Sequence, residues 1–227
     1  MKKILSLAVL LVFSLAMYAQ KDVTKFLGIP VDGTKSEMIK KLKEKGFTES
    51  SYDKDVLEGE FNGTDVQIFI VTNNNKVWRI AIADAYPRDE ANIRIRFNKL
   101  CSQFERNKKY FEANADSSDY TDYTIPDDED ISYEMRVNKK RYEALYTQLP
   151  DSAYVAQQLL SRYDKSQWDS IPPKWQESFF KLEKAKHKLI ATVTKSVWFT
   201  ISEHLSGGYF IMMYYDNEYN RAQGEDL

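Results

Sequence analysis

The spacing of apolar and polar residues after position 34 predicts a helix with both ends marked. Thr34 and Glu37 have the spacing of a capping box, in which each side chain hydrogen-bonds a backbone N–H that the first turn leaves unpaired. The apolar face of the helix is formed by Met38, Ile39 and Leu42. Gly46 suits the left-handed conformation that ends many helices, so Phe47 is expected to fold back onto the last turn.

Segments of strand character lie on both sides of this helix. Asn62-Gly63 is the strongest short signal of a β-hairpin, because both residues tolerate positive φ. The run 68–71 is apolar at every position, so we place its strand in the interior of a sheet. The strands expected here are residues 26–29, 56–61, 64–72 and 76–86.

The period becomes helical from Asp89. One face of this second helix is apolar and consists of Ile93, Phe97, Leu100, Cys101 and Phe104. Because Cys101 lies on the apolar face, we interpret it as a small buried hydrophobic residue rather than a reactive thiol.

The second half of the chain predicts two more pairs of strands with a helical insertion between them. The expected strands are residues 131–137, 141–149, 195–204 and 209–216. The insertion, residues 151–194, contains a short helix and, after Pro172-Pro173, a longer one. The longer helix has an apolar stripe of Trp175, Phe179, Leu182 and Leu189. Most lysines of this helix lie off the stripe and predict a solvated face, with an anionic ligand or membrane as the alternative.

Together these elements predict the α+β class, with a mainly antiparallel sheet built from hairpins and about four packed helices. We expect residues 20–227 to form a single compact domain. Its halves would be 20–113 and 131–217, which the acidic segment 115–130 joins, and a pseudo-repeat of the two halves is an alternative. The acidic segment lacks the ligand spacing and central glycine of an EF-hand, so we interpret it as a linker rather than a calcium site.

Composition narrows the classes of function. The 227 residues carry 32 basic and 34 acidic side chains, a balance that gives no electrostatic basis for nucleic-acid binding. A single cysteine excludes an intramolecular disulfide and a multi-thiolate zinc site. No P-loop, dinucleotide-binding glycine pattern or zinc-protease motif is present. We therefore expect no metal and no cofactor.

The first 19 residues have the pattern of a secretory signal peptide. Lys2 and Lys3 precede an apolar run from 4 to 17, and Ala19 is a suitable small residue at the cleavage point. The run is shorter than the roughly 20 residues of a membrane-spanning helix, and no later segment is closer to that length. Cys101 is too distant to carry an N-terminal lipid. We expect export to the periplasm or the cell exterior, without a lipid anchor.

Candidate catalytic groups are few. His204 precedes a glycine turn and is the best candidate for a base, with Ser206 or Asp216 as its partner. A strand-end histidine is more often solvated, so we treat an envelope hydrolase as the alternative function.

The aromatic content is the stronger signal, with 15 Tyr, 12 Phe and 4 Trp. In the strand 195–204, alternation places Val197, Phe199 and Ile201 toward the core and Trp198 on the wetter face. Trp78 shares a face with Ile80 and Ile82 and is a candidate core residue. The candidate binding residues are Trp198, Tyr209 and Tyr215. Such rings can contact a partner protein or stack on sugars.

Residues 26–34 and 215–227, together with Asn62-Gly63 and the Trp78 strand, resemble small secreted proteins of unknown function from Bacteroidales. The resemblance implies a Gram-negative envelope or secreted location and brings no catalytic residues. It also implies O-glycosylation at Ser152 and Ser170, where the local sequence is similar to the acceptor pattern of such bacteria. The first half resembles the helix-hairpin modules of β-lactamase-inhibitor-like and outer-membrane-assembly proteins, which present a sheet surface to another protein. The expected function is an exported, non-enzymatic module that binds an envelope protein or a glycan.

Overall fold

The computed structural model describes residues 21–112 and 122–222, which fold around one eight-stranded antiparallel sheet. The expected signal peptide, residues 1–19, and part of the acidic linker lie outside the described residues. In the order in which they lie side by side, the strands are β3 (Thr48–Glu49), β4 (Val56–Phe61), β5 (Thr64–Asn73), β6 (Lys76–Asp84), β10 (Tyr209–Asp216), β9 (Ser196–Glu203), β8 (Glu143–Gln148) and β7 (Tyr110–Phe111). The predicted α+β class is confirmed.

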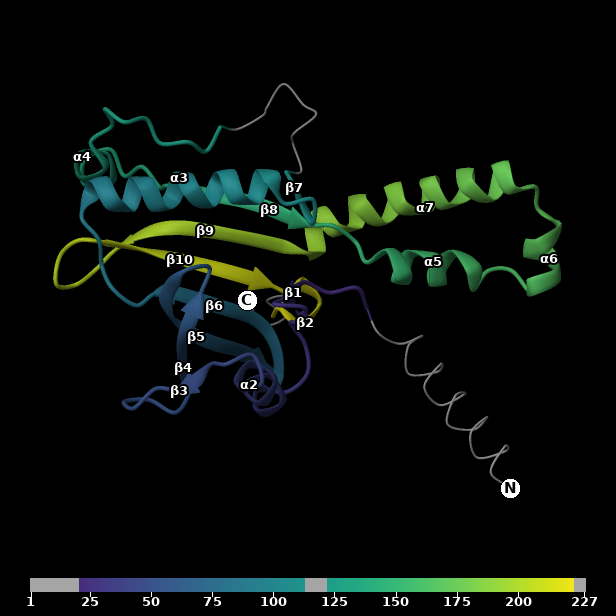
Figure 1. Ribbon diagram of the computed structural model, residues 1–227, viewed down its shortest axis with the longest axis horizontal. Coiled ribbons are helices and arrows are strands. Elements are labelled where there is room, and N and C mark those ends of the chain that lie inside the picture. Colours follow the sequence, from purple (N-terminus) through teal and green to yellow (C-terminus); the bar gives the residue numbers. More distant parts are fainter. Residues whose placement is uncertain (1–20, 113–121, 223–227) are drawn as a thin grey trace.

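Helices lie on the sheet and beyond its end (Figure 1). They are α2 (Lys35–Lys43), α3 (Glu90–Arg106), α4 (Ile131–Arg136), α5 (Ser152–Leu160), α6 (Lys165–Ser170) and α7 (Pro173–Thr194). A single 3-10 turn, η1 (Glu218–Asn220), follows β10. Four of the helices in the described ranges have seven or more residues, as expected.

Local signals explain why α2 begins and ends where it does. The Thr34 hydroxyl accepts from the N–H of Glu37, and the Glu37 carboxylate accepts from the N–H of Thr34 at 2.9 Å, so the predicted capping box is present. Gly46 has φ +99°, and the N–H of Phe47 donates to the carbonyl of Leu42. This is the expected Schellman ending, and it buries the Phe47 ring.

Tight turns set the register of the first hairpins. Asn62 and Gly63 both have positive φ, 54° and 72°, and Phe61 pairs with Thr64 across the turn. Asn74 and Asn75 adopt the same region between β5 and β6. The strand β5 lies between β4 and β6, so its predicted interior position is confirmed.

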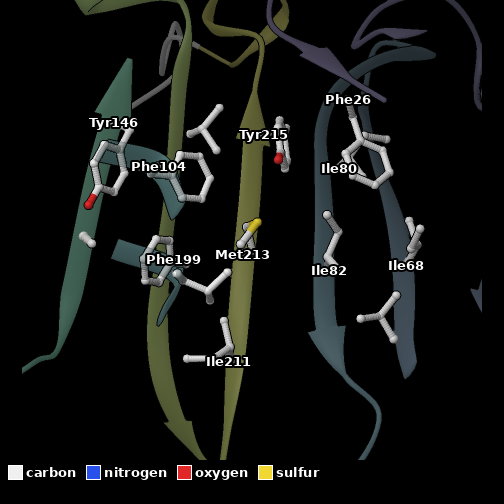
Figure 2. Packing of buried hydrophobic residues seen from close by; sticks show 14 of the residues in the cluster. Phe26, Ile68, Ile80, Ile82, Phe104, Tyr146, Phe199, Ile211, Met213 and Tyr215 are labelled. Carbon is white, nitrogen blue, oxygen red and sulfur yellow. The ribbon is translucent and has the colours of Figure 1, made fainter. Parts of the chain in front are cut away.

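One face of the sheet carries the hydrophobic core. Figure 2 shows this face, where Phe199, Met213, Ile82 and Ile68 project from neighbouring strands and Phe104 of α3 packs among them. The buried residues of α2 and α3 belong to the same apolar cluster. Both helices therefore cover one face of the sheet, and the two halves of the chain share one core.

The structure corrects two of the predicted strands. Residues 131–136 form the helix α4, because the Asp130 side chain caps its N-terminus and Ile131 is buried one helical turn from Met135. Residues 26–29 form a miniature hairpin of β1 (Lys25–Phe26) and β2 (Ile29–Pro30), because Leu27 and Gly28 turn the chain with positive φ. The pseudo-repeat is not confirmed.

The insertion 151–194 forms a helical arm, which we define as α5, α6 and α7. It connects β8 to β9 and projects beyond the end of the sheet (Figure 1). The two predicted helices of the insertion are present as α5 and α7. Among residues 21–112 and 122–222, no helix combines the length and the apolarity needed to cross a bilayer.

Candidate binding surface

The face of the sheet opposite the core carries partly exposed side chains. Along β9 and β10 buried side chains alternate with partly exposed ones, so one set points to the core and the other to the opposite face. We call this second face the open face. Its partly exposed or exposed members on β6, β8, β9 and β10 include Arg79, Leu145, Trp198, Thr200, Phe210, Met212 and Tyr214.

Four side chains form a contiguous cluster on the open face. The rings of Trp198 and Tyr214 are stacked, with centroids 4.1 Å apart and planes 25° apart. The guanidinium of Arg79 lies over the Tyr214 ring at 4.6 Å and over the Trp78 ring at 4.4 Å. The same guanidinium lies 5.4 Å from the centroid of the Trp198 ring, so Arg79 sits beside the Trp198–Tyr214 pair. We call Trp78, Arg79, Trp198 and Tyr214 the aromatic ladder.

A buried carboxylate anchors the aromatic ladder. Asp216 has a side chain that is 3% exposed, and it accepts two hydrogen bonds from Arg79, Nε to Oδ1 at 2.6 Å and Nη2 to Oδ2 at 2.7 Å. The indole Nε1 of Trp198 donates to Oδ2 at 3.0 Å. Burial raises the pKa of Tyr214, so this ring carries no charge at neutral pH. The ladder is thus a rigid, charge-compensated surface.

The geometry decides what this surface can contact. Trp198 and Tyr214 each have one ring face covered by the other, and Arg79 lies against both rings. A sugar ring stacks on a free aromatic face, and the Trp198–Tyr214 stack occupies one face of each of these rings. Ring edges and the neighbouring apolar side chains of Leu145 and Met212 are what the open face offers to a partner.

The three predicted binding residues have different positions. Trp198 lies on the open face, as the alternation predicted. Tyr209 and Tyr215 lie in the core, 5% and 4% exposed, and neither ring is available to a partner. The phenol of Tyr209 contacts the hydroxyl of Ser132 at 2.6 Å. The expectation of outward-facing rings is therefore corrected for both tyrosines, because the odd-numbered positions of β10 face the core.

Sequence reasoning missed Arg79 and placed Trp78 in the core. Trp78 is half-buried and lies outside the core cluster, beside Arg79. A register shift between Val71 and Thr72 interrupts the alternation next to this part of β6. The sequence did contain a signal for this part of the site, because Arg79 is a basic residue that follows Trp78 in an otherwise largely apolar strand.

Of the groups proposed for hydrolysis, the structure brings His204 and Ser206 together and leaves Asp216 apart. Nδ1 of the exposed His204 accepts a hydrogen bond from the N–H of Ser206 and lies 2.7 Å from its hydroxyl. Asp216 lies at the opposite end of the β9–β10 hairpin, where it binds Arg79. Glu203, next to the histidine, pairs with Arg136. None of these carboxylates accepts a hydrogen bond from His204, as the acidic member of a catalytic triad would to orient the ring.

A small pocket of about 70 Å³ lies where the arm joins the sheet. It is much smaller than the roughly 300–1,000 Å³ of small-molecule sites. Its lining includes Lys195, whose Nζ donates to Asp22 at 2.7 Å and to the carbonyl of Leu149 at 3.1 Å. Burial lowers the pKa of Lys195, but both hydrogen bonds hold the amine in place. We interpret this pair as the structural anchor of the arm.

Within the described ranges, no group of three His, Cys, Asp or Glu residues could hold a metal ion. The Cys101 thiol is buried, and burial raises its pKa to about 12. Comparison with protein-family models, curated proteins and solved structures gave no match. Functional inference for this chain therefore depends on its own geometry.

Proposed function

We propose that this chain is an exported, non-enzymatic module that binds a protein through the open face of its sheet. The observation that carries the proposal is the aromatic ladder, a cluster of two tryptophans, a tyrosine and an arginine that are partly exposed on this face. Trp, Tyr and Arg are the residue types enriched at the energetic centres of protein interfaces. The anchor of the ladder on Asp216 reduces the entropy lost when a partner binds.

A protein partner is favoured over a glycan by the way the rings are used. The Trp198–Tyr214 stack occupies one face of each ring, and the ring edges and aliphatic groups beside it pack well against another protein. A glycan is therefore an alternative outcome of the experiment below.

The test is capture of partners from envelope and culture fractions of the native host, with the wild type and two lysine variants as baits. Met212→Lys places a charge at the centre of the open face, and Val137→Lys places the same charge on an exposed apolar position after α4. A partner that requires the open face binds wild type and Val137→Lys equally and Met212→Lys at least ten-fold more weakly. Equal capture by all three baits, or a specific signal only on a glycan array, would contradict the proposal.

Export is proposed from the amino-terminal pattern and has its own test. Cleavage after Ala19 would leave Gln20 as the first residue of the mature chain. The mass of the protein recovered from the periplasm or medium of a Gram-negative host should match residues 20–227. Full-length protein confined to the cytoplasm would contradict export, without affecting the assignment of the open face.

A further inference from the structure

The arm carries an apolar stripe that faces solvent. Trp175, Leu182, Leu189 and Val193 of α7 are 60%, 70%, 72% and 68% exposed. Steps of seven, seven and four residues place them on one side of the helix. The sequence predicts an apolar stripe on α7, but this side is not the one that packs. The buried positions of α7 are Glu183, Ala191 and Thr194.

A buried ion pair explains why α7 packs with this side. Glu183 has a side chain that is 6% exposed, and it accepts two hydrogen bonds from Arg162, at 2.8 and 2.5 Å, next to His187. Val155 and Leu159 of α5 are buried, and α5 is the principal contact of α7. The ion pair turns one side of α7 toward α5 and leaves the heptad-spaced stripe without a partner in the described residues.

A row of lysines accompanies the stripe. Lys174, Lys181 and Lys188 each precede a stripe residue, so they run along one flank of Trp175, Leu182 and Leu189. All three are exposed, although Lys181 pairs with Glu177 at 2.7 Å and Nζ of Lys188 lies 4.5 Å from the centroid of the Phe111 ring. The helix has five lysines and two glutamates, and one of the glutamates is the buried Glu183. The flank of the stripe is therefore positively charged.

We propose that α7 docks the protein onto an anionic lipid bilayer, lying parallel to the surface. The stripe would enter the boundary between headgroups and acyl chains while the lysine row contacts anionic headgroups. A tryptophan at the end of the arm suits that boundary. This docking concerns α7 and is independent of the open face.

The size of the surface favours lipid over a second protein. A 22-residue helix is about 33 Å long, and a strip about 10 Å wide along it covers about 330 Å². Stable protein interfaces bury about 800 Å² on each partner. A bilayer needs no matching side chains and adapts to a narrow stripe, and its negative charge complements the lysine row.

The experiment is co-sedimentation of the protein with vesicles of phosphatidylglycerol or of phosphatidylcholine. We expect binding to the anionic vesicles and at least ten-fold weaker binding to the zwitterionic ones. The stripe variant is Leu182→Gln with Leu189→Gln. Its matched control is Leu205→Gln with Val137→Gln, two exposed apolar positions outside the arm. The stripe variant should bind anionic vesicles about ten-fold more weakly, and its control should bind like wild type.

The charge is tested in the same way. Lys174→Gln, Lys181→Gln and Lys188→Gln together should weaken binding at least ten-fold, because each lysine near the surface contributes to attraction. The α2 control removes three exposed charges from α2 and the turn that follows it, with Lys40→Gln, Lys41→Gln and Lys45→Gln. Quenching of tryptophan emission by brominated lipid should be much weaker in Trp175→Phe than in Trp198→Phe, and far-ultraviolet circular dichroism checks that each variant remains folded.

Three results would overturn the proposal. One is absence of wild-type binding to anionic vesicles. Another is equal loss of binding in the α2 control, which would assign the effect to overall charge. The third is a reversible dimer in sedimentation velocity that the Leu182 and Leu189 substitutions abolish, without vesicle binding, since the stripe would then belong to a second copy of the chain.

Discussion

Substitution of Arg79 should destabilise the protein mainly through the carboxylate that it leaves behind. In Arg79→Met, Asp216 stays buried with the Trp198 indole as its remaining side-chain donor, 3.0 Å away. Breaking a buried pair by removing one member costs about 3–5 kcal/mol. Because the Arg79 side chain is 20% exposed and the indole bond survives, we expect the lower end, about 3 kcal/mol.

A double-mutant cycle in urea separates this effect from lost packing. Asp216→Asn should cost about 1–2 kcal/mol, because Arg79 can reach water. The double variant should be less destabilised than the sum of the single variants by about 1–2 kcal/mol, since neither charge is then left alone. The Arg79→Met step is made once in the wild type and once in Asp216→Asn. The contacts of Arg79 with the rings of Trp78 and Tyr214 are lost in both steps, so their free energy cancels from the difference. Additivity within about 0.5 kcal/mol would refute the view that the pair anchors the ladder.

Other predictions concern the rest of the fold. Thr34→Ala removes the capping box of α2 and should lower the free energy of unfolding by about 1 kcal/mol in urea titration, and no measurable loss would contradict the cap. Cys101, whose pKa burial raises to about 12, should not react with a thiol reagent at pH 8 until urea unfolds the chain, whereas fast native labelling would show an open path to it. Hydrogen bonds from Arg162 hold the pKa of Glu183 below its usual 4.5, so their contribution is complete above pH 4.5 and is lost as the pH falls below that value. Amide exchange along α7 should therefore accelerate in acid, and Glu183→Gln should remove that pH dependence.

Elements with signals close together in the sequence could be predicted. The ends of α2 depend on side chains three residues apart and on one glycine, and the β4–β5 turn depends on Asn62-Gly63. Alternation in β9 placed Trp198 on the correct face. A strand with one buried side can direct either its odd or its even positions to the core, and Val197, Phe199 and Ile201 occupy odd positions of β9.

Elements that depend on distant partners could not be predicted. The pairing of Arg79 with Asp216 joins residues 137 positions apart, and it exists because β6 lies beside β10. Periodicity on α7 identified an apolar stripe but not which side of the helix meets α5, which depends on the ion pair of Arg162 and Glu183. Residues 131–136 contain strand-forming side chains, and the cap at Asp130 outweighs that preference.

The central claim is that a partner protein lies on the open face, and site-specific photo-crosslinking tests it most directly. A photoreactive amino acid replaces Leu145, which is 49% exposed and pairs with Trp198 across β8 and β9. A second variant carries it at Leu205, which is fully exposed in the β9–β10 turn. In envelope and culture fractions of the native host, we expect one discrete crosslinked protein from position 145 and none from position 205. A crosslink from position 205 alone, or none from position 145 while the wild type still captures its partner, would contradict the claim.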